Sequence, residues 1–306
     1  MRSAEPLRLV LLAAIGALAL CAMWAPGLFE ESAASPPGLV EVGILAAGFA
    51  IGCYGTVVGI GGGPLIVPVL HFVFGWSTED VVASSLFVVL LNALSGSAAY
   101  ARQKRIDIEG GVAFSVAAMP GAVVSGFFHH LVHVPSFDVI FGMFLLALAG
   151  YTVARVDGLD RPAVVTRLQR KRWRHVVMID AFRNKYDFYT NQNLGIAINI
   201  VLGFVAGFLG IGGGVLQVPV LVFLLGYPIH IATATSHFVT MLTSAFAVAP
   251  NVVLGNVHFG AVLWLGAGVL VGAQAGAKLA LRLKTKAILY LFAIILVAFA
   301  LRLFLY

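Results

Sequence analysis

Charge is scarce in this chain. Only 10% of its 306 residues are Asp, Glu, Lys or Arg, whereas 60% are hydrophobic. A soluble domain of this length needs far more charged surface. Uninterrupted apolar runs of about 20 residues recur, and each is long enough to cross a bilayer as a helix. The composition therefore predicts an all-α polytopic membrane protein, and its net charge of +6 concerns orientation and lipid headgroups rather than nucleic acid.

Cysteine and buried acid are also scarce. Cys21 and Cys53 both lie in apolar runs, which disfavours a disulfide framework or a metal site. No carboxylate falls deep in a predicted span. The acidic residues nearest to the spans stand at the ends of apolar runs, where solvation is easy: Asp80, Asp107, Glu109 and Asp138. A cation site built from carboxylates is therefore disfavoured, and no metal or other cofactor is expected.

Glycine, in contrast, is concentrated in one motif that occurs twice. The chain reads GIGGGPLIVPVL over 59–70 and GIGGGVLQVPVL over 210–221, with an offset of 151 residues. Three successive glycines are costly within a helix, so each motif predicts a broken helix, with Pro64 suited to the first helical position after the break. A break leaves backbone N–H groups unpaired, and such groups together with a helix start suit an anion.

Charge placement indicates how the first motif sits in the membrane. If 39–76 crossed the bilayer once, Arg102, Lys104 and Arg105 would lie outside, and so would the basic loop after Arg155. If 39–76 enters and returns as a re-entrant hairpin, both groups fall inside with the basic residues near Lys278, as the positive-inside rule favours. The hairpin interpretation gives seven crossings, two hairpins and a cytoplasmic N-terminus, and leaves near the outer loops His129, His130, His133 and His258.

The hairpin interpretation makes the two halves inverted-topology repeats with broken, re-entrant helices bearing the GIGGG turns. Small residues recur every fourth position at matched places, at Ala117, Gly121 and Ser125 and again at Gly268, Gly272 and Gly276; they allow membrane helices to pack closely. Inverted repeats with broken helices are typical of secondary transporters. The alternative is a duplicated bundle in which the glycines only permit packing.

The domain boundaries follow from these runs. Leu9–Trp24 is an extra N-terminal helix or a cleaved signal peptide, and we favour a retained helix. The predicted units are residues 1–38 (this helix and a linker), 39–155 (first repeat), 156–192 (a basic cytoplasmic loop) and 193–306 (second repeat).

Uncharged hydrogen-bond donors follow each glycine motif. Asn92 lies seven residues after Ser85, and Thr243 seven after Ser236, so each pair shares a helix face. Such donors suit a small oxyanion, although serine and threonine also bond back to their own helix. His237 breaks the symmetry and is either an anion or proton ligand or a neutral structural histidine. The predicted substrate-binding residues are Gly61, Gly62, Gly63, Ser84, Ser85, Asn92, Gly212, Gly213, Gly214, Gln217, Thr235, Ser236, His237 and Thr240.

The stretch RLQRKRWRH within 156–192 could be read as a nucleic-acid patch. The adjacent spans tether it to the bilayer, so we favour contact with anionic lipid headgroups, with Trp173 at the interface. A regulatory role and a homo-oligomeric state both remain open.

The doubled GxGGGxxxVPxL motif, each copy followed by a Ser/Thr-rich helix, resembles the sulfite exporter TauE/SafE family over 39–306. The resemblance implies a secondary transporter that moves sulfite, thiosulfate or organosulfonate across the bacterial inner membrane, linked to protons or to the membrane potential. An anion channel with the same site is the main alternative. An intramembrane serine hydrolase is disfavoured because Ser236 and His237, being adjacent, point about 100° apart on a helix and cannot pair.

Overall fold

The computed structural model describes residues 37–76, 78–128, 137–155, 173–208, 212–253 and 259–305. Predictions for the N-terminal helix, for the four histidines near outer loops and for the basic run 167–172 lie outside these residues. The first half contains α2 (Pro37–Val58), α3 (Gly63–Pro68), the π-helix η2 (Val69–Val73), α4 (Thr78–Arg102), α5 (Ile108–Phe128) and α6 (Phe137–Arg155). The second contains β1 (Arg174–Ile179), β2 (Lys185–Thr190), α8 (Gln192–Phe208), α9 (Gly214–Pro219), the π-helix η4 (Val220–Leu224), α10 (Ile229–Val253), α11 (Phe259–Ala280) and α12 (Thr285–Leu305).

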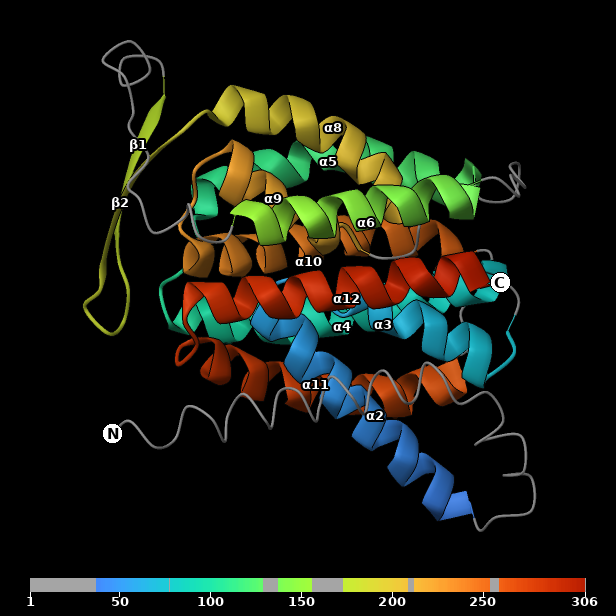
Figure 1. Ribbon diagram of the computed structural model, residues 1–306. Helices are drawn as coiled ribbons and strands as arrows, with labels where there is room; N and C mark the ends of the chain where they lie inside the picture. The colour runs from blue at the N-terminus through green and yellow to red at the C-terminus, as the bar shows by residue number, and fades with distance from the viewer. Residues whose placement is uncertain are drawn as a thin grey trace.

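The described residues are mostly helical (Figure 1). Five of their helices are long and apolar enough to cross a bilayer, namely α2, α4, α5, α10 and α11. The prediction of a helical, multi-pass membrane protein is therefore confirmed.

Helices of the first half pack against helices of the second in a reciprocal pattern. α2 packs along α11 and α5 packs along α8, while α4 pairs with α10 and α6 with α12. At the 151-residue offset, α2 corresponds to α8 and α5 to α11, so the first two pairs are the same contact made twice. The same correspondence relates α4 to α10 and α6 to α12.

Glycines bring the reciprocal pairs into backbone contact. A Cβ on Gly52 of α2 would lie 2.5 Å from the carbonyl oxygen of Val269, and the equivalent Gly203 of α8 lies against the backbone of Ala118. Gly272 meets Phe49, and its counterpart Gly121 meets Phe204. Gly121 and Gly272, two of the small residues predicted to permit close approach, do so at equivalent places in the two halves.

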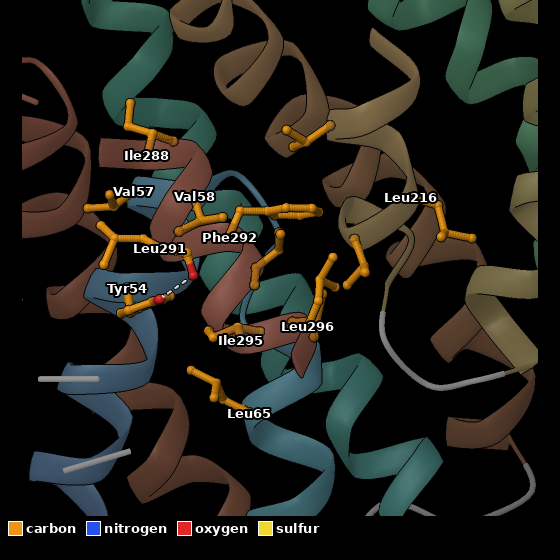
Figure 2. Close-up of a cluster of buried hydrophobic side chains, with 14 of the residues drawn as sticks. Tyr54, Val57, Val58, Leu65, Leu216, Ile288, Leu291, Phe292, Ile295 and Leu296 are labelled. Atoms are coloured by element: carbon orange, nitrogen blue, oxygen red, sulfur yellow. Dashed lines mark hydrogen bonds between the residues drawn. The ribbon is translucent and has the colours of Figure 1, made fainter. Parts of the chain in front are cut away.

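Helix α12 covers the end of α2 and the start of α3. Figure 2 shows Phe292 and Leu296 of α12 in one buried cluster with Val58 and Leu65. The hydroxyl of Tyr54 donates to the carbonyl oxygen of Leu291 at 2.5 Å. The first glycine motif is therefore enclosed by apolar packing on this side.

Three basic segments that are distant in sequence lie at one end of the helices. They are residues 102–105 after α4, the hairpin formed by β1 and β2, and residues 278–282 at the end of α11. The side-chain amide of Gln103, just after α4, donates to the carbonyl oxygen of Ala277 near the end of α11 at 3.1 Å. Arg105 pairs with Asp180 in the turn between β1 and β2. We call this the hairpin end (Figure 1).

The segments that follow the two glycine motifs, α3 with η2 and α9 with η4, lead to opposite ends of the helices; we call them the return arms. Tyr227, which follows η4, donates to Asp107 at 2.7 Å and therefore lies at the hairpin end. Trp76, which follows η2, precedes the 25-residue α4, whose length of about 37 Å separates it from that end. The arm after the first glycine motif thus runs away from the hairpin end, and the arm after the second glycine motif runs toward the hairpin end.

Part of the predicted basic loop is an antiparallel β-hairpin, which is a correction to the expected fold. Its register runs from Arg174 opposite Thr190 to Ile179 opposite Lys185. The carboxylate of Asp180 accepts hydrogen bonds from the backbone N–H groups of Phe182 and Asn184 and so closes the turn. The sequence carried a usable signal, since β-branched and aromatic residues recur on both sides of DAFRN.

Asp107 also departs from its prediction. It is buried, with 5% of its surface exposed, and it forms an ion pair with Arg174 of β1. Burial, followed by the neighbouring Asp107 carboxylate, raises the pKa of the Tyr227 phenol above its usual value, so this group stays a neutral donor. The expectation of easy solvation was wrong because Arg174 supplies a counter-charge that the linear sequence does not place there.

Docking of the hairpin is expected to weaken in acid. Burial acts to raise the pKa of Asp180, but hydrogen bonds from Asn184, Arg105 and Phe182 lower it below the usual value. A carboxyl whose folded-state pKa is lowered stabilises the fold above its unfolded pKa of about 3.9, and this contribution is lost as pH falls through the folded value. The protection of the 174–190 amides against hydrogen exchange, relative to the intrinsic rate at each pH, should therefore be high at neutral pH and fall below about pH 4. Asp180→Asn should exchange faster at neutral pH and lose this acid step; unchanged profiles would contradict the role of Asp180.

Candidate functional site

Each described glycine motif interrupts a helix through left-handed backbone. Helix α2 ends at Val58, and Gly61 and Gly62 have φ of 73° and 82° before α3 begins. Their counterparts Gly212 and Gly213 have φ of 71° and 82° before α9 begins. These values favour glycine over any residue with a Cβ. Pro64 is the second residue of α3, one position later than the sequence predicts, and lies in the first turn, where its missing N–H is no loss.

The two interruptions touch each other. A Cβ on Gly214 would lie 2.6 Å from the backbone carbonyl carbon of Ile60. Val89 of α4 and Thr240 of α10, which correspond under the 151-residue offset, each lie against both Gly61 and Gly212. We call this meeting point the glycine junction.

Buried polar atoms without a hydrogen-bond partner in the described structure gather around the glycine junction. Gly62 lies beside the side-chain amide nitrogen of Asn92, Gly61 beside Thr240, and Gly212 beside the hydroxyl of Ser244. A further unpartnered amide nitrogen belongs to Gln217 in α9. The unpartnered atoms are Asn92 Nδ2, Gln217 Nε2, Thr240 Oγ1 and Ser244 Oγ.

No buried carboxylate of the described residues belongs to this group. The buried acids are Asp107 and Asp180, which lie at the hairpin end and are paired with Arg174 and Arg105. The junction therefore combines free donors with an absence of fixed negative charge. Such a site favours an acceptor-rich, negatively charged ligand.

A short hydrogen-bond chain connects His237 to the junction. The hydroxyl of Thr56 donates to Asn92 Oδ1 at 3.0 Å and lies 3.2 Å from His237 Nε2. Because the hydroxyl proton points at Asn92, His237 Nε2 is the donor in the second bond. The chain fixes the amide of Asn92 so that its nitrogen remains beside Gly62.

The predicted serines and threonines do not all meet at the junction. Ser236 donates to the carbonyl oxygen of Gly59 and so binds the first glycine motif. Thr235 accepts from the backbone N–H of Asp107 at the hairpin end, and Ser85 donates back to Val82 in its own helix. Ser84 is buried in α4. Ser236 and His237 have separate partners, so these two residues do not form the nucleophile–base pair of a serine hydrolase.

A small cavity adjoins the second glycine motif. It has room for about one water molecule. Its polar lining includes Gln217, Thr240 and Thr243. Asn199 of α8 also lines it, and the side-chain oxygen Oδ1 of Asn199 has no hydrogen-bond partner among the described residues. Sequence reasoning missed Asn199, Thr56 and Ser244; the usable signals were polar residues inside apolar runs at 199 and 56 and, at 244, a serine one turn after Thr240.

Paired apolar helices, two helix interruptions in contact and uncharged donors at that contact are the features of a membrane transporter. The sulfite exporter TauE/SafE family matches residues 3–101 and 44–303, and the chain belongs to this family. The family resemblance seen in the sequence is thereby confirmed.

Curated relatives carry matching descriptions. The chain is 31% identical over 270 residues to the "probable membrane transporter protein YunE" of Bacillus subtilis, covering 85% of this chain and 93% of the relative. It is 28% identical over 207 residues to a "probable membrane transporter protein" of Methanocaldococcus jannaschii, covering 66% and 68% respectively. The "probable membrane transporter protein YjnA" of Bacillus subtilis is 24% identical over 268 residues, covering 86% of this chain and 100% of the relative. No solved structure matches the chain.

Proposed function

We propose that the glycine junction binds a small sulfur-containing oxyanion, such as sulfite, thiosulfate or an organosulfonate, and that the protein carries it across the bacterial inner membrane by alternating access. The observation that carries this proposal is a group of four unpartnered buried donors around the two glycine motifs. Those of Asn92, Thr240 and Ser244 belong to side chains at the glycine junction, and that of Gln217 lines the adjoining cavity with Gly213 and Thr240. The family description supplies the sulfur anion as the substrate class.

Energetics favour a ligand at these atoms. A buried donor left unpaired costs about 1–3 kcal/mol, so four such groups make the empty junction expensive. An oxyanion offers several acceptor oxygens at once and would satisfy donors from α4, α9 and α10 together. The proposed ligands from the predicted set are the glycine motifs, Asn92, Gln217, Thr240 and, through its chain to Asn92, His237.

The arrangement of the two halves supports a carrier. The reciprocal helix pairs and the oppositely directed return arms are what inverted repeats over 39–155 and 193–306 require. The cavity beside the junction admits about one water molecule, so an oxyanion needs a rearrangement to enter. A closed centre of this kind fits alternating access better than an open channel. Liposome flux that accelerates when the same anion is present on the opposite side distinguishes a carrier from a channel.

The hairpin end is the proposed cytoplasmic side. It gathers the basic residues after α4, the hairpin and the end of α11, and the positive-inside rule favours a cytoplasmic location for them. With this end inside, a re-entrant 39–76 preceded by one crossing places the N-terminus in the cytoplasm as well. Contact of 156–192 with anionic headgroups belongs to the same proposal.

Thr240→Val tests the junction directly. Valine has nearly the shape of threonine but removes an unpartnered hydroxyl. Anion affinity is expected to fall about tenfold, because one hydrogen bond to a charged ligand is lost. The free energy of unfolding should stay equal or rise by about 1 kcal/mol, because a desolvation cost is relieved. Sulfite binding by calorimetry and thermal unfolding of the purified protein measure the two effects.

Thr152→Val is the matched control. Thr152 is buried in α6 and its hydroxyl already bonds to the carbonyl oxygen of Leu148, away from the junction. This variant should bind sulfite normally. A Thr240→Val protein that loses stability yet keeps its affinity would show a structural role for the hydroxyl and would remove Thr240 from the site.

A further inference from the structure

A second pocket lies at the hairpin end, apart from the glycine junction. Its volume is about 420 Å³, much larger than the cavity beside the junction. The turn between β1 and β2 forms one side, and the end of α11 with the following loop forms another. The lining residues are Arg105, Phe182, Asn184, Lys278, Leu281 and Arg282.

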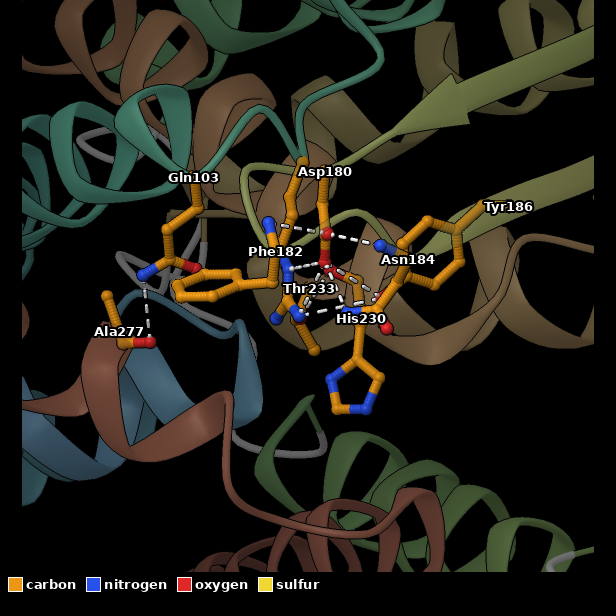
Figure 3. A network of polar contacts seen from close by, with 9 residues as sticks. Gln103, Asp180, Phe182, Asn184, Tyr186, His230, Thr233 and Ala277 are labelled. Atoms are coloured by element: carbon orange, nitrogen blue, oxygen red, sulfur yellow. Dashed lines mark hydrogen bonds and ion pairs between the residues drawn. The ribbon is translucent and has the colours of Figure 1, made fainter.

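Arg105 is the buried part of this pocket, with 3% of its surface exposed. Its Nε and Nη2 both donate to Asp180 Oδ2, at 3.3 and 3.1 Å. Its Nη1 is buried and has no acceptor among the described residues. Figure 3 shows the surrounding network, with Asp180, Asn184 and Tyr186 on the hairpin side and Gln103 bonded to Ala277. A buried guanidinium group with one unused donor face is an incomplete anion site.

Two further cations face the same space. Lys278 and Arg282 are exposed, and neither has an ion-pair partner in the part of the chain that the structure describes. Asp180 does not neutralise them, because its oxygens accept from Arg105, Phe182 and Asn184. Three cations thus lie at the pocket, and the one carboxylate near them, that of Asp180, is already paired with Arg105.

We propose that this pocket binds a phosphate group. Phosphate offers several strong acceptor oxygens, which match the unused Nη1 of Arg105 and the charges of Lys278 and Arg282. The group could belong to an anionic phospholipid headgroup or to a soluble phosphate; the apolar edge formed by Phe182 and Leu281 accommodates either a glycerol backbone or an ester. A bound phosphate would fasten the hairpin turn to the end of α11, the helix that packs along α2.

Paired substitutions test the pocket by binding, independently of transport. Lys278→Gln and Arg282→Gln each remove one exposed cation while leaving the buried Arg105–Asp180 pair intact. Each is expected to weaken binding about tenfold, and the double variant about a hundredfold. Arg102→Gln is the control, because Arg102 is an exposed cation at the same end that does not line the pocket. Arg105 itself is kept, since its loss would leave Asp180 buried without its partner.

Two probes distinguish the source of the phosphate. Calorimetry with inorganic phosphate in chloride buffer tests a soluble ligand, and native mass spectrometry with phosphatidylglycerol against diacylglycerol tests a lipid headgroup. Binding of either phosphate-bearing probe that weakens in the Lys278 and Arg282 variants, but not in Arg102→Gln, supports the proposal and identifies the source. Absence of binding to the wild-type protein, or equal binding by the double variant, overturns it.

Discussion

Gly214→Ala is expected to reduce transport about 100-fold. The added Cβ would lie within 2.7 Å of three backbone atoms of Ile60, and backbone cannot move aside as a flexible side chain can. The two glycine motifs must therefore separate, at a cost of about 1–3 kcal/mol in unfolding free energy. A displacement of the donors by even 1 Å would reduce sulfite flux about 100-fold. Flux into proteoliposomes, normalised to inserted protein, is the measurement.

Gly150→Ala provides the matched control. Gly150 is also a helical glycine, in α6, and a Cβ there meets nothing within 4 Å. This variant should transport and unfold like the wild-type protein. Normal flux in Gly214→Ala would mean that contact between the glycine motifs is dispensable, and the proposed site would have to be abandoned.

Asn92→Asp should have the second large effect. The substitution keeps the shape of the side chain but exchanges an unpartnered amide donor beside Gly62 for a carboxyl group. A negative charge at that point would repel an anionic ligand by several kcal/mol, so sulfite affinity should fall about 1000-fold or more. Asn92→Leu removes the donor without adding charge and should lose only about tenfold.

The contrast between the two Asn92 variants isolates the electrostatic part of the effect. Calorimetric titration of both proteins with sulfite, at a pH where carboxyl groups are ionised, gives the two affinities. Equal losses would indicate a purely steric or structural role for Asn92. Tighter binding by Asn92→Asp would point to a cation as the ligand and would reverse the proposed chemistry.

Much of the helical framework could be predicted from the sequence because it depends on local composition. Apolar runs, triple glycines and a proline at 64 act within a few residues, and their consequences are visible in α2, α3 and α9. The repeat offset also predicted where small residues permit close approach, since Gly121 and Gly272 occupy equivalent positions in one repeated contact.

The composition of the site depended on tertiary geometry and could be predicted only in part. Thr235 and Ser236 are adjacent, yet one contacts Asp107 and the other Gly59, because neighbouring helix positions face different directions. Asn199 lines the cavity through α8, which no motif marks. The hairpin was not predicted because the basic run before it indicated a surface loop for the whole segment. The burial of Asp107 was not predicted because its counter-charge, Arg174, lies 67 residues away in the sequence.

Among the described residues, the β-hairpin belongs to the second half of the molecule alone, and this has a thermodynamic consequence. Two identical halves would give the inward-facing and outward-facing forms equal free energy, so neither would predominate at rest. The hairpin binds Arg105 through Asp180 and Asp107 through Arg174, and Asp107 also accepts a hydrogen bond from Tyr227 of the second half. Opening of the molecule at the hairpin end must break or strain these contacts, whereas opening at the opposite end leaves them intact. In the proposed alternating-access cycle, the resting form would then be the one that opens on the side away from the hairpin.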